Sequence, residues 1–402
     1  MKALVPAALL LLVAPARAGR ITVGVDSRIE LAGVTQALRP AAEDPKSFRR
    51  PDIGYSRMIE RLSASGAPVP AAPGALDFED RCQVLLRVSS APALAPRLMM
   101  PYDLAERAGG PERLQAWLDA LSAFARGTDF SAHLARAERL LEDREAALRR
   151  KVEERDYVGE EEAYTGLALN GSYSIYLSPY VDGGLSTNSI EPREDGVVEI
   201  ESVFGRQAGS EEGGGFWSIR APGLLWHETG HGIVDPLADV FADRVDASSA
   251  AYRSSWGCYG DWRQCVKEQV VRAVMIRLVA RDFGEAAAAD QLAFENEKRF
   301  PQLKAMIESL KAYEKSRARY PTLADYYPRL LEVLPPPPEG VAAAARLELA
   351  GRFDCRPAPI RNRMRAYLDQ LAARAKDPAL LAAVRAARAA PALDAAACRE
   401  SR

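Results

Sequence analysis

The chain has 402 residues, of which 48 % are hydrophobic and 27 % are charged, as is usual for a folded protein. This composition excludes a disordered or collagen-like chain. The 53 Lys and Arg residues nearly balance the 55 Asp and Glu residues, which gives a formal net charge of −2. The balance argues against a nucleic-acid-binding protein, because such proteins carry a basic excess.

The first 18 residues have the pattern of a secretory signal peptide. Lys2 precedes an apolar stretch over residues 3–14, and Ala16-Arg17-Ala18 forms a small-residue cleavage signal. The apolar stretch is too short to span a bilayer comfortably, and no other segment approaches spanning length. We therefore expect an exported bacterial protein, periplasmic or extracellular, without a membrane span, whose mature chain starts near Gly19.

Five cysteines follow the cleavage signal, and in an oxidising compartment some of them are expected to pair. The most local candidate pair is the second with the third, although the spacing does not determine the connectivity and one thiol must be left over. No C-x-x-C pattern is present, which argues against a zinc ribbon or a redox motif. The five are Cys82, Cys258, Cys265, Cys355 and Cys398.

Residues 19–160 are predicted to form an N-terminal, mainly helical region. A β-branched alternation over 21–25 predicts a short strand, and residues 28–38 have helical spacing. Residues 40–76 are rich in Pro, Ala and charge, and they predict irregular connections around one helix over 55–63. A further helix begins at Pro111 and stops at Gly127, and the next runs from about residue 131 towards residue 154.

Residues 161–335 are predicted to form a second domain that combines strands and helices. Alternating residues over 172–177 and 196–204 predict two strands separated by a turn-rich stretch, and from Pro222 to about residue 333 the pattern is helical. Residues 336–402 follow as a Pro-rich spacer and an Ala- and Arg-rich helical tail, whose charges are typical of a solvated face. The predicted fold class is α+β, mostly helical, with a small mixed or antiparallel sheet packed beside one motif-bearing helix.

That helix carries two of the three histidines, four residues apart, in the H-E-x-x-H sequence HETGH at 227–231. Positions i and i+4 of a helix share one face, so His227 and His231 can ligate one ion. Glu228 lies about 100° round the helix from His227, where a general base could take a proton from a water on that ion. The alternative is a buried helix with two incidental histidines, each of which would then need another partner. Asp235, just before Pro236, is predicted to end the helix.

A catalytic zinc ion needs a third protein ligand and an open position. The metzincin pattern requires Gly at position 234 and His at position 237, where this chain has Val234 and Leu237. No histidine follows His231, which leaves a carboxylate, a cysteine or the distant His133. His133 is more typical of a satisfied core or surface histidine.

Glu268 is the predicted third ligand. It lies in a strongly helical stretch, 262–283, on the apolar face with Val271 and Met275, where a carboxylate needs a partner. A salt bridge to Arg272 at i+4 is the alternative, and both can hold because Arg272 could orient Glu268. Three aspartates closer to the motif instead fit the polar side of a helix, and these are Asp239, Asp243 and Asp246.

Two histidines from H-E-x-x-H and a glutamate from a following helix resemble the gluzincin branch of zinc metallopeptidases, over roughly residues 196–283. The resemblance implies a zincin-like catalytic domain over 161–335, in which a strand edge beside the active-site helix binds substrate backbone. The strand over 196–204 is the candidate edge. The chain departs from that branch at 267–273, where KEQVVRA replaces an N-E-x-x-x-D-type signature.

The chain also resembles a family of exported bacterial proteins with a domain of unknown function, up to about residue 335. The shared segments are VDSRIEL at 25–31, the HETGH helix with the following DPL, EQVVRA at 268–273 and YEKSRARYPT at 313–322. Because the activity of that family is inferred from its zinc motif, the resemblance implies a metallopeptidase-like site without naming a substrate.

We therefore expect a zinc-dependent hydrolase, a metallopeptidase of peptides or proteins, in which Glu228 is the general base. Its Zn²⁺ would be held by His227, His231 and Glu268. A second donor should stabilise the oxyanion, and the candidates for that role or for supporting the ligands are Arg272, Asp235, Tyr252, Tyr259 and Tyr313. Two alternatives stay open: a catalytically inactive zinc-containing binding or structural protein, and a zinc hydrolase of a non-peptide amide in the cell envelope. The oligomeric state is not indicated.

Overall fold

A computed structural model describes residues 21–39, 53–98, 100–168, 171–182, 184–192, 198–206, 221–249, 262–296 and 300–335, with the isolated residues 373, 381 and 385. The predicted signal peptide and nearly all of the predicted tail lie outside this part, and the domain boundaries stay predictions. The helices and strands are β1 (Ile21–Gly24), α1 (Ser27–Ala37), α2 (Ile53–Ser63), α3 (Phe78–Leu86), α4 (Tyr102–Arg107), α5 (Pro111–Gly127), α6 (Phe130–Glu153), α7 (Tyr157–Thr165), β2 (Gly171–Asp182), β3 (Gly184–Pro192), β4 (Val198–Arg206), α8 (Ala221–Val240), α9 (Ala242–Ala247), α10 (Trp262–Asn296), α11 (Leu303–Lys315), α12 (Leu323–Leu330) and η3 (Leu331–Val333).

The described elements confirm the predicted α+β class, mostly helical with a small mixed sheet. The strand order is β1-β2-β4-β3, in which β1 and β4 run parallel to β2 and β3 runs antiparallel to β4. The predicted strands near residues 21, 172 and 196 correspond to β1, β2 and β4. β3 was predicted to be part of a turn-rich stretch, because its Gly, Ser and Asn residues disfavour strands and only the pairing with β4 makes it one.

The prediction that residues 196–204 form a substrate-binding edge is wrong. β4 pairs with β2 on one side and with β3 on the other, so both of its hydrogen-bonding edges are used within the sheet. A peptide can add only to a strand that has an unpaired edge. The local alternation of residues 196–204 shows that a strand forms there, but it carries no information about the position of that strand in the sheet.

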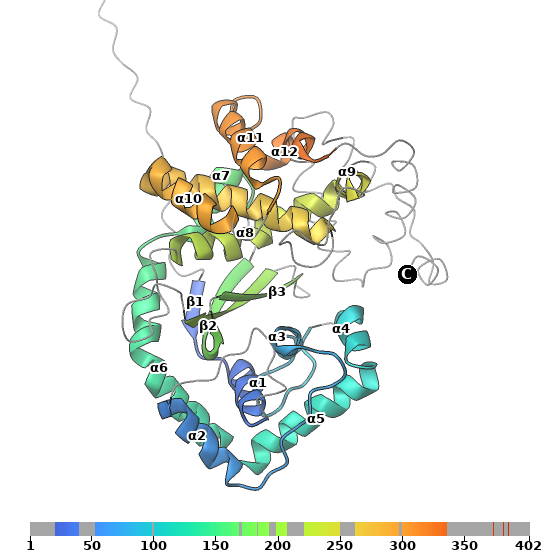
Figure 1. The fold of residues 1–402 in the computed structure, drawn as a ribbon, viewed down its shortest axis with the longest axis vertical. Helices are drawn as coiled ribbons and strands as arrows, with labels where there is room; N and C mark the ends of the chain where they lie inside the picture. The colour runs from blue at the N-terminus through green and yellow to red at the C-terminus, as the bar shows by residue number, and fades with distance from the viewer. Residues whose placement is uncertain are drawn as a thin grey trace, which may run out of the picture.

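The sheet lies between two helical layers (Figure 1). Because successive side chains of a strand point to opposite faces, each strand contributes to the hydrophobic core on both sides. Tyr173, Ile175 and Ile200 pack in a cluster with α8, α10, α11 and α12. Tyr180 and Val203 pack in a second cluster with α1, α3 and α5. The long helix α6 contributes residues to both clusters and so joins the two layers.

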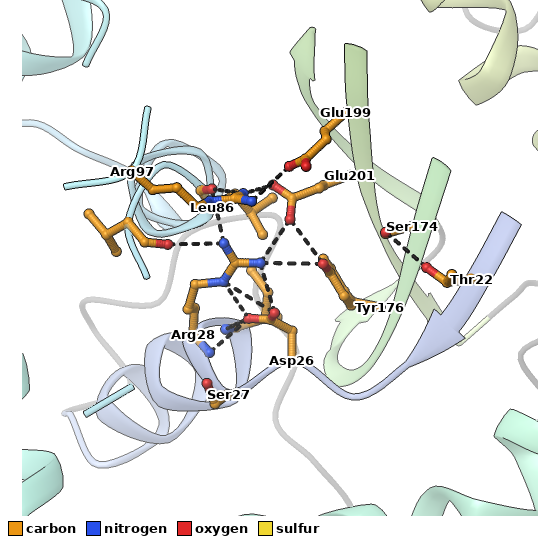
Figure 2. A network of polar contacts seen from close by, with 12 residues as sticks. Thr22, Asp26, Ser27, Arg28, Leu86, Arg97, Ser174, Tyr176, Glu199 and Glu201 are labelled. Atoms are coloured by element: carbon orange, nitrogen blue, oxygen red, sulfur yellow. Dashed lines mark hydrogen bonds and ion pairs between the residues drawn. The ribbon is translucent and has the colours of Figure 1, made fainter. Parts of the chain in front are cut away.

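A buried polar network ties the sheet to the N-terminal layer (Figure 2). Arg28 donates to both oxygens of Asp26, through Nε to Oδ1 at 2.9 Å and through Nη2 to Oδ2 at 2.8 Å. Its Nη2 also donates to Glu201 Oε1 at 2.8 Å, and Arg97 Nη2 donates to Glu201 Oε2 at 3.0 Å. Arg97 further pairs with Glu199 at 2.7 Å. The network joins α1, the segment after α3 and β4.

The prediction that the motif helix ends at Asp235 is also wrong, because α8 continues through Pro236 to Val240. A proline inside a helix removes one backbone hydrogen bond and costs about 3 kcal/mol. Leu237 and Ala238 follow it and are fully buried in the core with α10. Burying a leucine side chain contributes about 1.5 to 3 kcal/mol, so tertiary packing offsets the local penalty here.

The predicted helix over 262–283 is confirmed and is longer than expected. α10 begins at Trp262 and extends to Asn296 across a break at Gly284, where φ is 88° and ψ is 164°. Glycine adopts a positive φ without steric cost, which allows the chain to change direction there. The second half then runs back along the first, since Glu295 contacts Arg272.

Cys265 takes part in a disulfide bond, and Cys82 is a buried free thiol. Cys258, the predicted partner of Cys265, lies outside the described residues. Among the helices that the structure describes, none combines the length and apolar character needed to cross a bilayer.

Candidate metal centre

Three buried side chains from two helices converge on one point: His227 and His231 from α8, and Glu268 from α10. The two histidine Nε2 atoms are 3.3 Å apart. Glu268 Oε2 lies 3.6 Å from His227 Nε2, and its Oε1 lies 3.7 Å from His231 Nε2. The structure thus brings together the three residues that the sequence singles out as ligands.

The donor atoms and their spacing fit a metal ion. Zinc binds histidine nitrogen and carboxylate oxygen at about 2.0 to 2.2 Å, commonly as a tetrahedron, in which neighbouring donors lie about 3.4 Å apart. The distance of 3.3 Å between the two Nε2 atoms is close to that value, and each Nε2 has one of the two Glu268 oxygens at 3.6 or 3.7 Å. This buried His-His-Glu group could therefore hold a metal ion with little movement of its side chains.

Two of the three candidate ligands, His231 and Glu268, are supported by further polar contacts. His231 Nδ1 lies 3.1 Å from Asp235 Oδ1, one helical turn further along α8. Such a carboxylate fixes the ring orientation and leaves Nε2 available to an ion. Glu268 receives a hydrogen bond from Gln264 Nε2 on Oε1 at 3.2 Å and pairs with Arg272 Nη1 through Oε2. Asp235 and Arg272 therefore occupy the supporting positions expected from the sequence.

Glu228 lies beside the triad, with its Oε1 4.0 Å from His227 Nε2, and is only 3 % exposed. The sheet faces it through Tyr173 of β2, whose hydroxyl donates to Ser202 Oγ at 2.8 Å. Burial, together with the nearby negative charge of Glu228, raises the pKa of Tyr173 well above its usual value. Glu228 thus lies near both the imidazole of His227 and Tyr173 of the sheet.

The electrostatics of the triad favour a positive charge at this point. Burial lowers the pKa of His231, but Asp235, Glu268 and Glu228 outweigh it and raise that pKa to about 9. Burial likewise opposes ionisation of Glu268, yet Arg272 and His231 hold its pKa below the ordinary value. The Glu268 carboxylate therefore stays ionised and attracts a cation, either a proton on His231 or a metal ion.

Gly230 of the motif lies where α7 packs against α8. A Cβ at this position would lie 2.8 Å from Glu161 Oε1 and 3.3 Å from Val271 Cγ1, which is too close for the first of these contacts. Glu161 is fully buried, and burial raises its pKa well above the usual value, which favours the neutral carboxyl. The glycine thus lets α7 approach the back of the metal-binding helix.

Two further groups near the triad were not predicted. Glu295, from the second half of α10, accepts a hydrogen bond from Arg272 Nε at 2.9 Å. Glu79, in the first turn of α3, has its pKa raised to about 7 by burial and by the charges of Asp77, Asp80, Glu228 and Glu268. No local pattern identifies either residue, because Glu295 follows the Gly284 break and Glu79 belongs to the opposite helical layer.

Two of the remaining candidates, Tyr313 and His133, make their contacts away from the triad. Tyr313 of α11 is fully buried, and its hydroxyl donates to the backbone oxygen of Tyr164 at 3.1 Å, so it braces α7. Tyr252 and Tyr259 lie outside the described residues. His133 is a buried core histidine, with Nε2 2.7 Å from Glu30 Oε1.

The aspartates that follow the motif are partly accounted for by ion pairs. Asp239 pairs with Lys267 at 3.0 Å, and Asp246 pairs with Arg263. Both partners lie on α10, so these pairs join the two helices beside the metal centre and support the prediction that these aspartates are not ligands. The side chain of Asp243 lies outside the described part.

No curated protein matches the chain, and no solved structure does. A family model matches residues 84–333, which is more than half of the chain and includes all three triad residues and Glu228. Its description confirms the expected resemblance to proteins with a domain of unknown function. The chain therefore belongs to the family described as "Domain of unknown function (DUF4932)".

Proposed function

We propose that this protein is an exported zinc metallopeptidase of the gluzincin type. The observation that carries the proposal is the convergence of His227, His231 and Glu268, with Glu228 buried beside them. Two imidazoles and one carboxylate from protein, with a further position left for water or substrate, form a typical catalytic zinc site. Calcium and magnesium prefer sites built of oxygen ligands, so the donor set favours zinc.

Glu228 is the proton carrier of the proposed reaction. A bound zinc ion supplies Lewis-acid polarisation of a carbonyl and makes a water molecule acidic near neutral pH. The Glu228 carboxylate takes the proton from the attacking water and returns it to the departing amine nitrogen. Because Glu228 is almost fully buried, bulk water competes little for that proton.

The sheet supports a peptide as substrate. Among the described strands, β3 is at the end of the sheet and pairs with β4 alone, and α8 packs against β3. An extended peptide that adds to the outer edge of β3 would run close to the metal-binding helix. Backbone pairing of this kind suits peptides better than other amides.

Two features support export. The first 18 residues have the pattern of a signal peptide, and Cys265 is disulfide-bonded, which is typical of oxidising compartments outside the cytosol.

The test is cleavage of a peptide library by the purified full chain, with zinc content measured on the same sample. We expect cleavage that a chelator abolishes and zinc restores. Glu228→Gln should lower turnover by about 100-fold or more and still bind zinc, because glutamine keeps the shape but cannot accept the proton. Glu308→Gln is the control, since Glu308 is exposed on α11 and pairs only with Lys311 among the contacts found.

Other outcomes of this assay would support a different function or contradict the mechanism. Stoichiometric zinc without any cleavage would indicate the inactive binding protein. Cleavage of glycan-linked peptides alone would indicate an amide of the cell envelope. Full turnover by the Glu228→Gln variant would contradict the mechanism.

A further inference from the structure

We propose that Glu295 is a positioning residue of the metal centre: through Arg272 it holds the ligand Glu268 and sets the affinity for the metal ion. The inference rests on the proposed metal site but not on hydrolysis. It assigns a role to a carboxylate that lies outside the H-E-x-x-H motif and beyond the predicted helix.

The connection runs through one guanidinium group. Arg272 places Nη1 against Glu268 Oε2, and its Nη1 also donates to the Glu268 backbone oxygen at 3.2 Å. On another side of the same planar group, Nε donates to Glu295 Oε2 at 2.9 Å. Glu268, Arg272 and Glu295 are each less than 10 % exposed. A planar fork held at Nε has little freedom left at Nη1, so Glu295 fixes the direction from which Arg272 reaches the ligand.

Glu295 is itself held in place. Its Oε1 accepts a hydrogen bond from Gln291 Nε2 at 2.9 Å, one turn earlier on the same helix. Phe300 covers the guanidinium, with its ring centre 4.2 Å from the central carbon of Arg272. The break at Gly284 is what brings this half of α10 back against the half that carries Glu268. The helical hairpin therefore supplies a rigid support behind the ligand.

The charges of Arg272 and Glu295 also affect how strongly Glu268 can bind a metal ion. Arg272 is a cation beside a carboxylate that also has to bind a metal cation, so its pull on Glu268 competes with the ion. Glu295 shares the guanidinium charge and so weakens that competition. Replacing Glu295 by glutamine leaves the full charge of Arg272 on Glu268 and frees the fork to turn, and both effects weaken metal binding.

The test measures the metal and not the reaction. We expect Glu295→Gln to weaken zinc affinity about tenfold or more in a competition titration, as is usual when a supporting group of a metal ligand is changed. The visible absorption of the protein loaded with cobalt instead of zinc should change as well, since it reports ligand geometry. Glu314→Gln is the matched control, because Glu314 accepts from Nε of another α10 arginine, Arg277, at 2.8 Å and is not part of the triad.

The role of Arg272 as intermediary has its own test. In an Arg272→Gln background, Glu295→Gln should cause no further loss of zinc affinity, since the connection is already cut. Gln291→Met is a milder variant for the case that Glu295→Gln does not fold. It keeps the side-chain volume but removes the hydrogen bond to Glu295, and it should weaken zinc binding about threefold.

Two results would overturn the proposal: unchanged zinc affinity in folded Glu295→Gln or Gln291→Met, or an undiminished effect of Glu295→Gln without Arg272. A wild-type protein that binds no zinc would instead remove the proposed function together with this inference.

Discussion

Two charged clusters, each with a buried centre, lie on opposite faces of the sheet, and they differ in the ratio of positive to negative side chains. In the network of Figure 2, two arginines meet three carboxylates, and Tyr176 donates to one of them. In the candidate metal centre, among the residues that the structure describes, one arginine, Arg272, lies with four buried carboxylates, which are Glu228, Asp235, Glu268 and Glu295.

This difference in charge distinguishes a cluster that supports the fold from one that can bind a cation. Burying a charge without a partner costs several kcal/mol, so a cluster that only supports the fold should satisfy itself. The Arg28 network does so with protein groups. The metal centre has a deficit of positive charge, which the raised pKa of His231 also shows, and a dication would remove most of it. A buried excess of carboxylates around convergent imidazoles therefore favours the binding of a cation.

The largest expected effect comes from breaking the Arg28 network of Figure 2. Arg28→Met should lower the free energy of unfolding by about 3 to 5 kcal/mol, because it leaves Asp26 buried without its cation and leaves Glu201 with Arg97 alone. Urea unfolding measures the loss, and we expect the same loss with zinc and with chelator.

Lys151→Met is the control, since Lys151 pairs with Glu154 and the two side chains are 45 % and 57 % exposed. An exposed pair should contribute less than about 1 kcal/mol. A loss of that small size at Arg28, or a loss seen only with zinc, would contradict the self-sufficiency of the Figure 2 network.

The unbalanced cluster should respond to the metal instead. Removing zinc with a chelator should lower the free energy of unfolding by about 3 kcal/mol relative to protein with free zinc at a hundred times the dissociation constant. The thermal midpoint with and without chelator measures this. His231→Ala should lose the zinc effect and Arg28→Met should keep it. An identical midpoint in both conditions would mean that the triad binds no ion.

The same two clusters show how far the sequence alone can predict the site. The motif residues His227, Glu228 and His231 lie within two turns of α8, and Glu268 lies on the apolar face of α10. Local periodicity therefore identifies them. Glu295 is invisible to that reasoning, because it reaches Arg272 only after the chain reverses at Gly284.

The fold has a similar limit. The helices α5 and α6 follow from their apolar spacing, and β1, β2 and β4 from their alternation. The order of the strands, the continuation of α8 through Pro236 and the strand β3 depend on contacts between distant segments. Propensity rules describe only local preferences, and at these places the burial of distant residues outweighs them.

The smallest expected effect concerns Glu79, where the N-terminal layer faces the unbalanced cluster. Burial and neighbouring carboxylates raise its pKa from 4.5 to about 7. Below about pH 4.5 the group is protonated in the folded and the unfolded chain alike, so it adds no penalty there. Between about pH 4.5 and 7 the unfolded chain gives up this proton while the folded protein keeps it, so stability falls as the pH rises through this window and levels off above it. In the metal-free protein, the free energy of unfolding of Glu79→Gln relative to wild type should therefore increase by on the order of 1 to 2 kcal/mol from pH 5 to pH 8.

Measuring the effect of Glu79→Gln with and without zinc tests whether Glu79 senses the charge of the metal centre. A bound dication offsets the charges of Glu228 and Glu268 that Glu79 senses, so the gain from Glu79→Gln should shrink when zinc is present. Urea unfolding at both pH values, with zinc and with chelator, measures the four free energies, and Glu112→Gln on the exposed first turn of α5 is the control. A gain that is the same with and without zinc would mean that Glu79 does not sense the metal centre, and the two helical layers would then be electrostatically independent there.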